Sequence, residues 1–115
     1  MKTLFCDYFV AKSQPAPNGE YWGALAIVNR SSTDQIALLT ITKFETGEEI
    51  KKFNINLKPK QGALLDNTAE PFLNVIGRTR LHLDCSEHVT ATVGNCKGTY
   101  SAISWERMAE LPFPK

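Results

Sequence analysis

The segment from His82 to His88 reads HLDCSEH and contains residue types that bind zinc in proteins. The candidate ligands recur every three residues, at His82, Cys85 and His88, with Asp84 between the first two. Residues three apart in a β-strand point to opposite faces, so His82 and Cys85 would diverge. Structural zinc sites take four ligands from paired segments, and the sequence has no second pair. We therefore predict a surface strand ending in a polar turn, with no metal and no cofactor.

Nucleophilic catalysis is the second chemistry that these residue types permit. It needs a nucleophile, a base within hydrogen-bond reach and a group that orients the base. The sequence contains two histidines, but neither a Gly-x-Ser-x-Gly turn nor a phosphate-binding glycine loop. We therefore predict that the protein is not an enzyme. A small enzyme built around Cys96 or the two histidines remains an alternative.

Three cysteines, Cys6, Cys85 and Cys96, are too few for a disulfide framework. If residues 86–88 form the turn between two strands, Cys96 lies roughly 20 Å from Cys85, at ~3.3 Å per residue. A disulfide tolerates a Cα separation of about 7 Å at most. We therefore expect free, mostly buried thiols, as in a reducing compartment.

A row of basic residues, Arg78, Arg80 and His82, alternates with other residues and would lie on one face of a strand. An arginine guanidinium can hold a carboxylate or phosphate through two parallel hydrogen bonds. The row either docks an acidic partner or a nucleic-acid backbone, or it is an ordinary charged face that discourages edge-to-edge pairing. Lysines that could extend the row are Lys51, Lys52, Lys58 and Lys60.

Tyr21 and Trp22 are adjacent in a nearly apolar segment, so they must point to opposite faces of a strand. The one that leaves the core could be covered by a second subunit, or it could join Tyr100 and Trp105 in a platform for sugars. The tail after Trp105 contains two prolines and cannot continue a central strand. It either covers its own sandwich or packs on a second copy. The candidate self-association residues are Tyr21, Trp22, Met108, Leu111 and Phe113.

Alternation of apolar and polar residues with a period of two dominates the chain and predicts strands. The segments over residues 35–43 and 49–57 flank an acidic turn that contains Gly47, which indicates a hairpin. Further strands are expected over residues 3–10, 21–29, 78–85, 89–94 and 99–106. Residues 67–77 lack alternation, and we interpret them as a connection between sheets. Its apolar residues, which could plug one end of the core, are Phe72, Leu73, Val75 and Ile76.

Seven or eight strands with turn signals every 8–12 residues predict an antiparallel β-sandwich of the immunoglobulin-like kind, with a closed β-barrel as the alternative. Only residues 104–111 could hold a single helical turn. The length fits one domain over residues 1–115. A net charge of +1 argues against a dedicated nucleic-acid binder. No apolar stretch approaches the ~18–20 residues of a membrane span, and no leader is recognised, so we expect a cytoplasmic location.

The plan of the chain also resembles a known family. A strand ending in Asn leads into a polar turn, then into ITKFETGEEIKKFNINLKPKQG, and later into VTATVGN. Over residues 21–95 this pattern is similar to small bacterial β-sandwich proteins of the sensory rhodopsin transducer type. The resemblance implies a cytoplasmic, non-enzymatic homo-oligomer, often a tetramer, that signals by contact. It brings no catalytic residues.

From these observations we expect an intracellular β-sandwich adaptor that assembles with itself, as a dimer or tetramer, and contacts a protein partner in signalling. The candidate docking residues are Arg78, Arg80 and His82. The alternatives are a sandwich that binds a small ligand or a carbohydrate, and an unrecognised enzyme.

Overall fold

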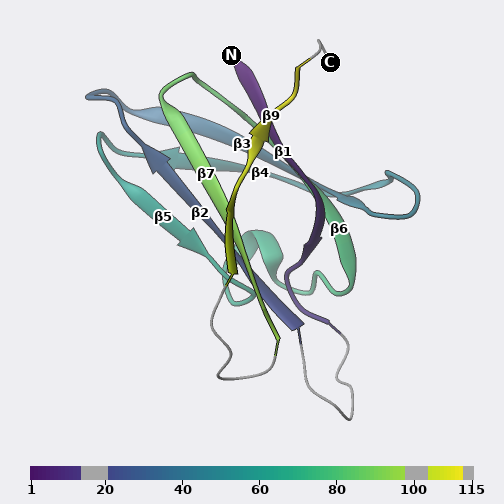
Figure 1. Cartoon of the computed structure of the whole chain (residues 1–115). Coiled ribbons are helices and arrows are strands. Elements are labelled where there is room, and N and C mark those ends of the chain that lie inside the picture. The colour runs from purple at the N-terminus through teal and green to yellow at the C-terminus, as the bar shows by residue number, and fades with distance from the viewer. Residues whose placement is uncertain (14–20, 98–103, 113–115) are drawn as a thin grey trace.

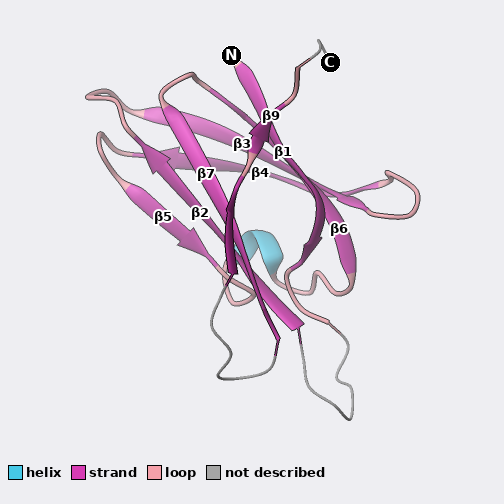
Figure 2. Cartoon of the chain, in the orientation of Figure 1, coloured by secondary structure: helices cyan, strands magenta, loops and turns pink. Residues whose placement is uncertain are grey.

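The computed structural model of the chain is a two-layer sandwich of antiparallel strands (Figure 1, Figure 2). It describes residues 1–13, 21–97 and 104–112. Sheet A has the strand order β4-β3-β6-β1-β9, and sheet B has the order β5-β2-β7-β8. Sheet A contains β1 (Lys2–Val10), β3 (Gln35–Lys43), β4 (Glu49–Leu57), β6 (Arg78–Cys85) and β9 (Ala109–Glu110). Sheet B contains β2 (Tyr21–Asn29), β5 (Gly62–Leu65), β7 (Val89–Lys97) and β8 (Ser104–Arg107).

The predicted β-sandwich is confirmed, and the two sheets do not close into a barrel. The pairs β2–β5 and β3–β6 match the second–fifth and third–sixth strand pairs of an immunoglobulin sandwich, but β1 lies beside β6 and β7 beside β2, so the full strand order differs. The described residues form nine strands, more than the seven or eight expected. The four-residue strand β5 was not anticipated, and the window over residues 104–111 is extended instead of forming a helical turn.

The β3–β4 hairpin forms as the alternation predicts. Gly47 lies in its turn with φ = 73°, a conformation that glycine adopts without steric cost. The turn over residues 86–88 is different from a hairpin turn, because it leads from β6 in sheet A to β7 in sheet B. Each sheet turns alternate residues inward, and the core includes Phe9, Leu25, Ile27, Leu39, Leu81, Leu83 and Val89.

The two sheets approach each other at the end of β1. Just after β1 the chain crosses toward sheet B. There Lys12 forms an isolated β-bridge with Trp22, and the Gly23 backbone N–H donates to the Ala11 carbonyl at 3.1 Å. A Cβ atom at Gly23 would lie 2.7 Å from the Val10 carbonyl oxygen and 2.8 Å from the Phe9 ring. Glycine is therefore required where the first strand passes over the second.

The connection over residues 67–77 contains one short 3-10 turn, Glu70–Phe72. Phe72 and Val75 enter the core, and the Phe72 ring packs against Phe9 with centroids 5.2 Å apart. Leu73 and Ile76 remain 45% and 49% exposed. The predicted plug is therefore made by two of its four apolar residues, because the backbone of this irregular segment directs Leu73 and Ile76 to solvent.

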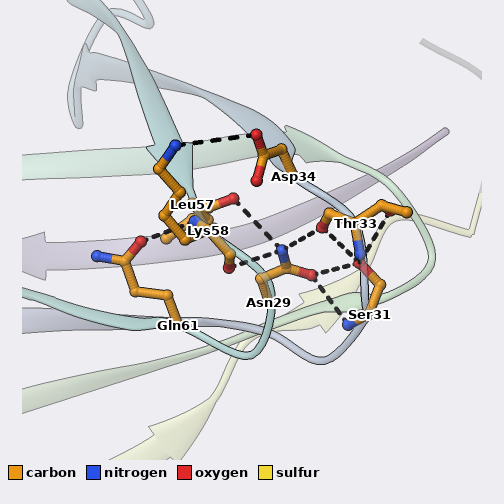
Figure 3. Close-up of polar contacts among 7 residues, drawn as sticks. All are labelled: Asn29, Ser31, Thr33, Asp34, Leu57, Lys58 and Gln61. Atoms are coloured by element: carbon orange, nitrogen blue, oxygen red, sulfur yellow. Dashed lines mark hydrogen bonds and ion pairs between the residues drawn. The ribbon is translucent and has the colours of Figure 1, made fainter.

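A buried amide at Asn29 joins the two sheets at the opposite end (Figure 3). Its Nδ2 donates to the carbonyls of Thr33 at 2.8 Å and Lys58 at 3.0 Å, with a longer contact to Leu57 at 3.4 Å. Its Oδ1 accepts from the Ser31 backbone N–H at 2.9 Å and from the Ser31 hydroxyl at 2.7 Å. We call these five residues the Asn29 corner. It fastens the β2–β3 connection to the end of β4.

Replacing Asn29 with Asp keeps the shape of the side chain and removes its donors. A carboxylate there would face carbonyl oxygens in a buried site, so we expect a loss of about 3 kcal/mol in the free energy of unfolding at pH 7. Repulsion raises the folded-state pKa of such a carboxyl above its unfolded value of about 3.9. The loss in the free energy of unfolding relative to the wild type therefore becomes smaller as the pH falls toward 4. Urea unfolding at both pH values measures this.

The matched control is Asn54→Asp, because Asn54 is exposed on the outer face of β4. We expect that variant to lose less than about 0.5 kcal/mol, as exposed substitutions usually do. Equal stability of the two variants at pH 7 would contradict the role given to the Asn29 corner.

Candidate protein-interaction surfaces

The predicted docking residues lie together on the outer face of sheet A. Along β6, Arg78, Arg80 and His82 alternate with buried residues, so all three point away from the core. His82 lies in the middle of the sheet, with Thr40 of β3 opposite on one side and Phe5 of β1 on the other. The strand alternation therefore places the row as the sequence predicts.

Two aromatic residues that the sequence did not single out surround the arginines. The rings of Tyr8 and Phe44 meet edge to face with centroids 5.3 Å apart. The guanidinium carbons of Arg78 and Arg80 lie 5.9 Å and 5.6 Å from the centroid of the Phe44 ring. We call these four residues the Phe44 cluster. Tyr8 reaches it because a bulge between Cys6 and Phe9 re-aims β1.

The two arginines of the Phe44 cluster have different roles. Arg80 donates a hydrogen bond to the Phe44 carbonyl and so holds the end of β3. Arg78 pairs with Glu45 at 2.7 Å, and its side chain is 55% exposed. Aromatic and arginine side chains carry much of the binding energy at protein interfaces. The cluster therefore has the composition of a docking surface.

The lysines do not extend this row. Lys51 donates to the carbonyls of Glu70 and Leu73 and secures the 3-10 connection, and Lys60 donates to the Arg30 carbonyl. The remaining two form exposed ion pairs, Lys52 with Glu49 and Lys58 with Asp34. Such pairs contribute about 0–1 kcal/mol each.

The outer face of sheet B has a different composition from that of sheet A. Strand register places three small or apolar residues of β2 there, Ala24, Ala26 and Val28, and Leu64 of β5 lies opposite Ala26. Among the residues of β2, β5, β7 and β8 whose side chains are described, this face holds one charged residue, Arg107 of β8. Solvated faces of antiparallel sheets usually carry polar residues at alternate positions. The described part of this face is therefore poorer in charge than the outer face of sheet A.

Both tryptophans lie on the same outer face of sheet B. Trp105 is opposite Gly94, which is opposite Ala24, so the three residues form one row across β8, β7 and β2. Trp105 is 47% exposed and Leu64 is 64% exposed, whereas Ala24 is 2% exposed. Trp22 is half-buried one row further along. The face thus has large apolar groups toward its edges and small residues between them.

The C-terminal segment joins the two sheets. Residues 104–107 pair with β7 of sheet B, and residues 109–110 pair with β1 of sheet A. Met108, between them, is 4% exposed and packs in the core of its own chain, so its side chain is not free to contact a second copy. The Leu111 backbone N–H donates to the Thr3 carbonyl at 2.9 Å. We call residues 104–111 the strap.

Two predicted self-association residues have no described side chain. The Tyr21 backbone pairs with Lys97, but its side chain lies outside the described residues, as does all of Phe113.

Two of the three cysteines are described as free thiols. Burial raises the pKa of the Cys85 thiol, and Cys85 is fully buried. Burial also raises the pKa of Cys6, with smaller contributions from Glu106 and Asp7. A raised pKa leaves less thiolate at neutral pH, which is the opposite of an activated nucleophile. His82 and Cys85 point to opposite faces of β6. Within residues 1–13, 21–97 and 104–112, no three His, Cys, Asp or Glu residues lie close enough to hold a metal ion.

We expect iodoacetamide to modify Cys85 at pH 7 at least about a hundred-fold more slowly in the native protein than in denaturant, because burial limits both access and ionisation. Cys6, half-buried, should react at an intermediate rate. Mass spectrometry of alkylated peptides over time measures both rates, and the denatured protein should carry three adducts. Rapid native alkylation of Cys85, or fewer than three adducts in denaturant, would contradict this.

Comparison with known proteins gives likeness of fold alone. No family model and no curated protein matches the chain. The crystal structure of Thermotoga maritima 1070 superposes with a TM-score of 0.66 and 10% identity, covering 94% of this chain and 92% of that one. The Anabaena sensory rhodopsin transducer superposes with a TM-score of 0.53 and 11% identity, covering 86% and 89% of the two chains. The resemblance to the transducer type is therefore confirmed at the level of the fold. In the described part of the chain, no helix has the length and apolar character needed to cross a membrane.

Proposed function

We propose that the protein is a non-enzymatic, intracellular adaptor that assembles with itself through the outer face of sheet B and presents the outer face of sheet A to a protein partner. The observation that carries the proposal is the contrast between the two outer faces. The outer face of sheet A displays Arg78, Arg80 and His82, whereas the described side chains on the outer face of sheet B include one charge, Arg107. Likeness in fold to a signalling transducer supports a role in signalling.

Self-assembly would remove exposed apolar groups from water. Large exposed apolar patches on soluble proteins mark interaction sites. Two strands of nine residues and two of four, about 4.8 Å apart, give a face of roughly 400 Å². That is about half of the roughly 800 Å² per partner that standard interfaces bury, and it lies in the range of weak, transient contacts. We therefore expect a closed symmetric dimer or tetramer that forms at micromolar concentration.

Leu64→Glu tests the interface with little cost to the monomer. Leu64 is 64% exposed on the edge strand β5, so a glutamate there meets solvent in the free chain and a second apolar face in the assembly. We expect gel filtration with light scattering to give the wild-type protein a multiple of 12.8 kDa at micromolar concentration. The variant should assemble only at a protein concentration at least about ten-fold higher, because the interface would have to desolvate the new charge.

Ile36→Glu is the matched control. Ile36 is 60% exposed, similar to Leu64, but it lies on the outer face of sheet A. This variant should assemble like the wild type. A wild-type mass of 12.8 kDa across the micromolar range would overturn the proposed self-assembly. Loss of assembly in both variants would show that the interface is not confined to the outer face of sheet B, which contradicts the proposed location.

Carbohydrate binding is a second candidate, because Trp22 and Trp105 lie on one face of sheet B and neither is buried. Aromatic rings on a flat sheet can stack on sugars. Titration with a panel of glycans should quench tryptophan fluorescence if this function holds, and unchanged fluorescence would exclude it for the glycans used.

A further inference from the structure

Among the described residues, one edge of β1 has a neighbouring strand along only the first part of its length. β9 pairs with Leu4 and Phe5 alone. The preceding part of the strap pairs instead with β7 of sheet B. On that side, the backbone of residues 6–9 therefore has no strand partner among the described residues. Figure 1 shows β1 curving away from the C-terminal strand over this stretch.

A cavity of about 310 Å³ lies where β1 and the strap separate. Residues 5–8 line one side, residues 106–109 line the other, and Val93 of β7 contributes apolar surface between them. We call this cavity the β1 slot. Unpaired strand edges are templates for an added strand, and peptide-binding domains use them in that way.

The charges around the β1 slot favour a cation. Asp7 and Glu106 lie on its two sides, and both are exposed. Both carboxylates act electrostatically on the half-buried Cys6 between them, since each contributes to raising the pKa of its thiol. Arg107 also lines the slot, but it is paired with Thr92, and both residues lie on the outer face of sheet B. Glu106 is paired with the buried Val93 and lies on the opposite face.

We propose that the β1 slot binds an extended segment of a protein partner, which adds a strand to the free edge of β1 and inserts a lysine or arginine side chain between Asp7 and Glu106. The main-chain hydrogen bonds supply affinity, and the two carboxylates supply selectivity for the basic residue. Tyr8 lines the slot and also belongs to the Phe44 cluster, so the segment would continue onto the proposed docking face. The proposal rests on the partner-binding function but not on self-assembly.

The probe is the peptide acetyl-SVTVKVTS-amide, with a second peptide that carries glutamate in place of the lysine. Amide chemical shifts of the ¹⁵N-labelled protein follow each titration. The lysine peptide should shift the signals of residues 5–8 and 106–109 and saturate below about 5 mM, as expected of a weak strand-addition contact. The glutamate peptide should bind at least about ten-fold more weakly, because it meets two like charges. Methylating the backbone nitrogens along one edge of the lysine peptide should also abolish binding.

Protein variants test the two carboxylates. Asp7→Asn and Glu106→Gln should each lower the affinity for the lysine peptide by about three-fold, as expected for exposed charge pairs. The control Glu48→Gln, in the β3–β4 turn, should leave the affinity for the lysine peptide unchanged. Absence of shifts at 5 mM peptide, shifts confined to other residues, or equal affinity for the lysine and glutamate peptides would overturn the proposal. Repeating the titration on Leu64→Glu separates this result from self-assembly, since the slot should bind equally well in that variant.

Discussion

The amide of Asn29 ends β2 at a point that solvent does not reach, and hydrogen bonds inside the protein replace water there. Because one side chain both donates and accepts, it fixes the β2–β3 connection relative to the end of β4. That connection carries the chain from sheet B to sheet A, so the corner sets how the two layers face each other. The outer faces on which the proposed contacts depend follow from this arrangement. A buried polar group costs free energy when any of its partners is lost, so the corner tolerates few substitutions.

Local patterns in the sequence predicted most of the fold, and contacts between distant segments account for what was missed. The β3–β4 hairpin and the shared face of Arg78, Arg80 and His82 follow from alternation, which is a property of neighbouring residues. Tyr8 and Phe44 are 36 positions apart and meet because of a bulge in β1 that has no clear sequence signal. The residues of β5 are too few to show alternation, and the strap changes sheets at Met108 because of packing.

The two edges of the sandwich are built differently, and this difference matters for binding. At one edge β4 and β5 end the two sheets. At the other edge the strap joins both sheets, yet it follows β1 only over residues 3–5. The strap therefore holds the layers together, and among the described residues it leaves residues 6–9 of β1 without a strand partner on that side. Charged groups and the open part of β1 lie toward sheet A, whereas the outer face of sheet B is nearly uncharged in the part described. This contrast is the basis for proposing one face for a second copy and the other for a different partner.

Trp22 and Trp105 are the two tryptophans of the chain, and both lie on the outer face of sheet B. Their fluorescence therefore reports on the proposed interface directly. Acrylamide quenching measured from nanomolar to tens of micromolar protein should fall as copies assemble, because Trp105 changes from 47% exposed to covered. Its concentration dependence should match that of the light-scattering mass. A quenching constant that stays the same while the mass rises would place the interface elsewhere and contradict the account.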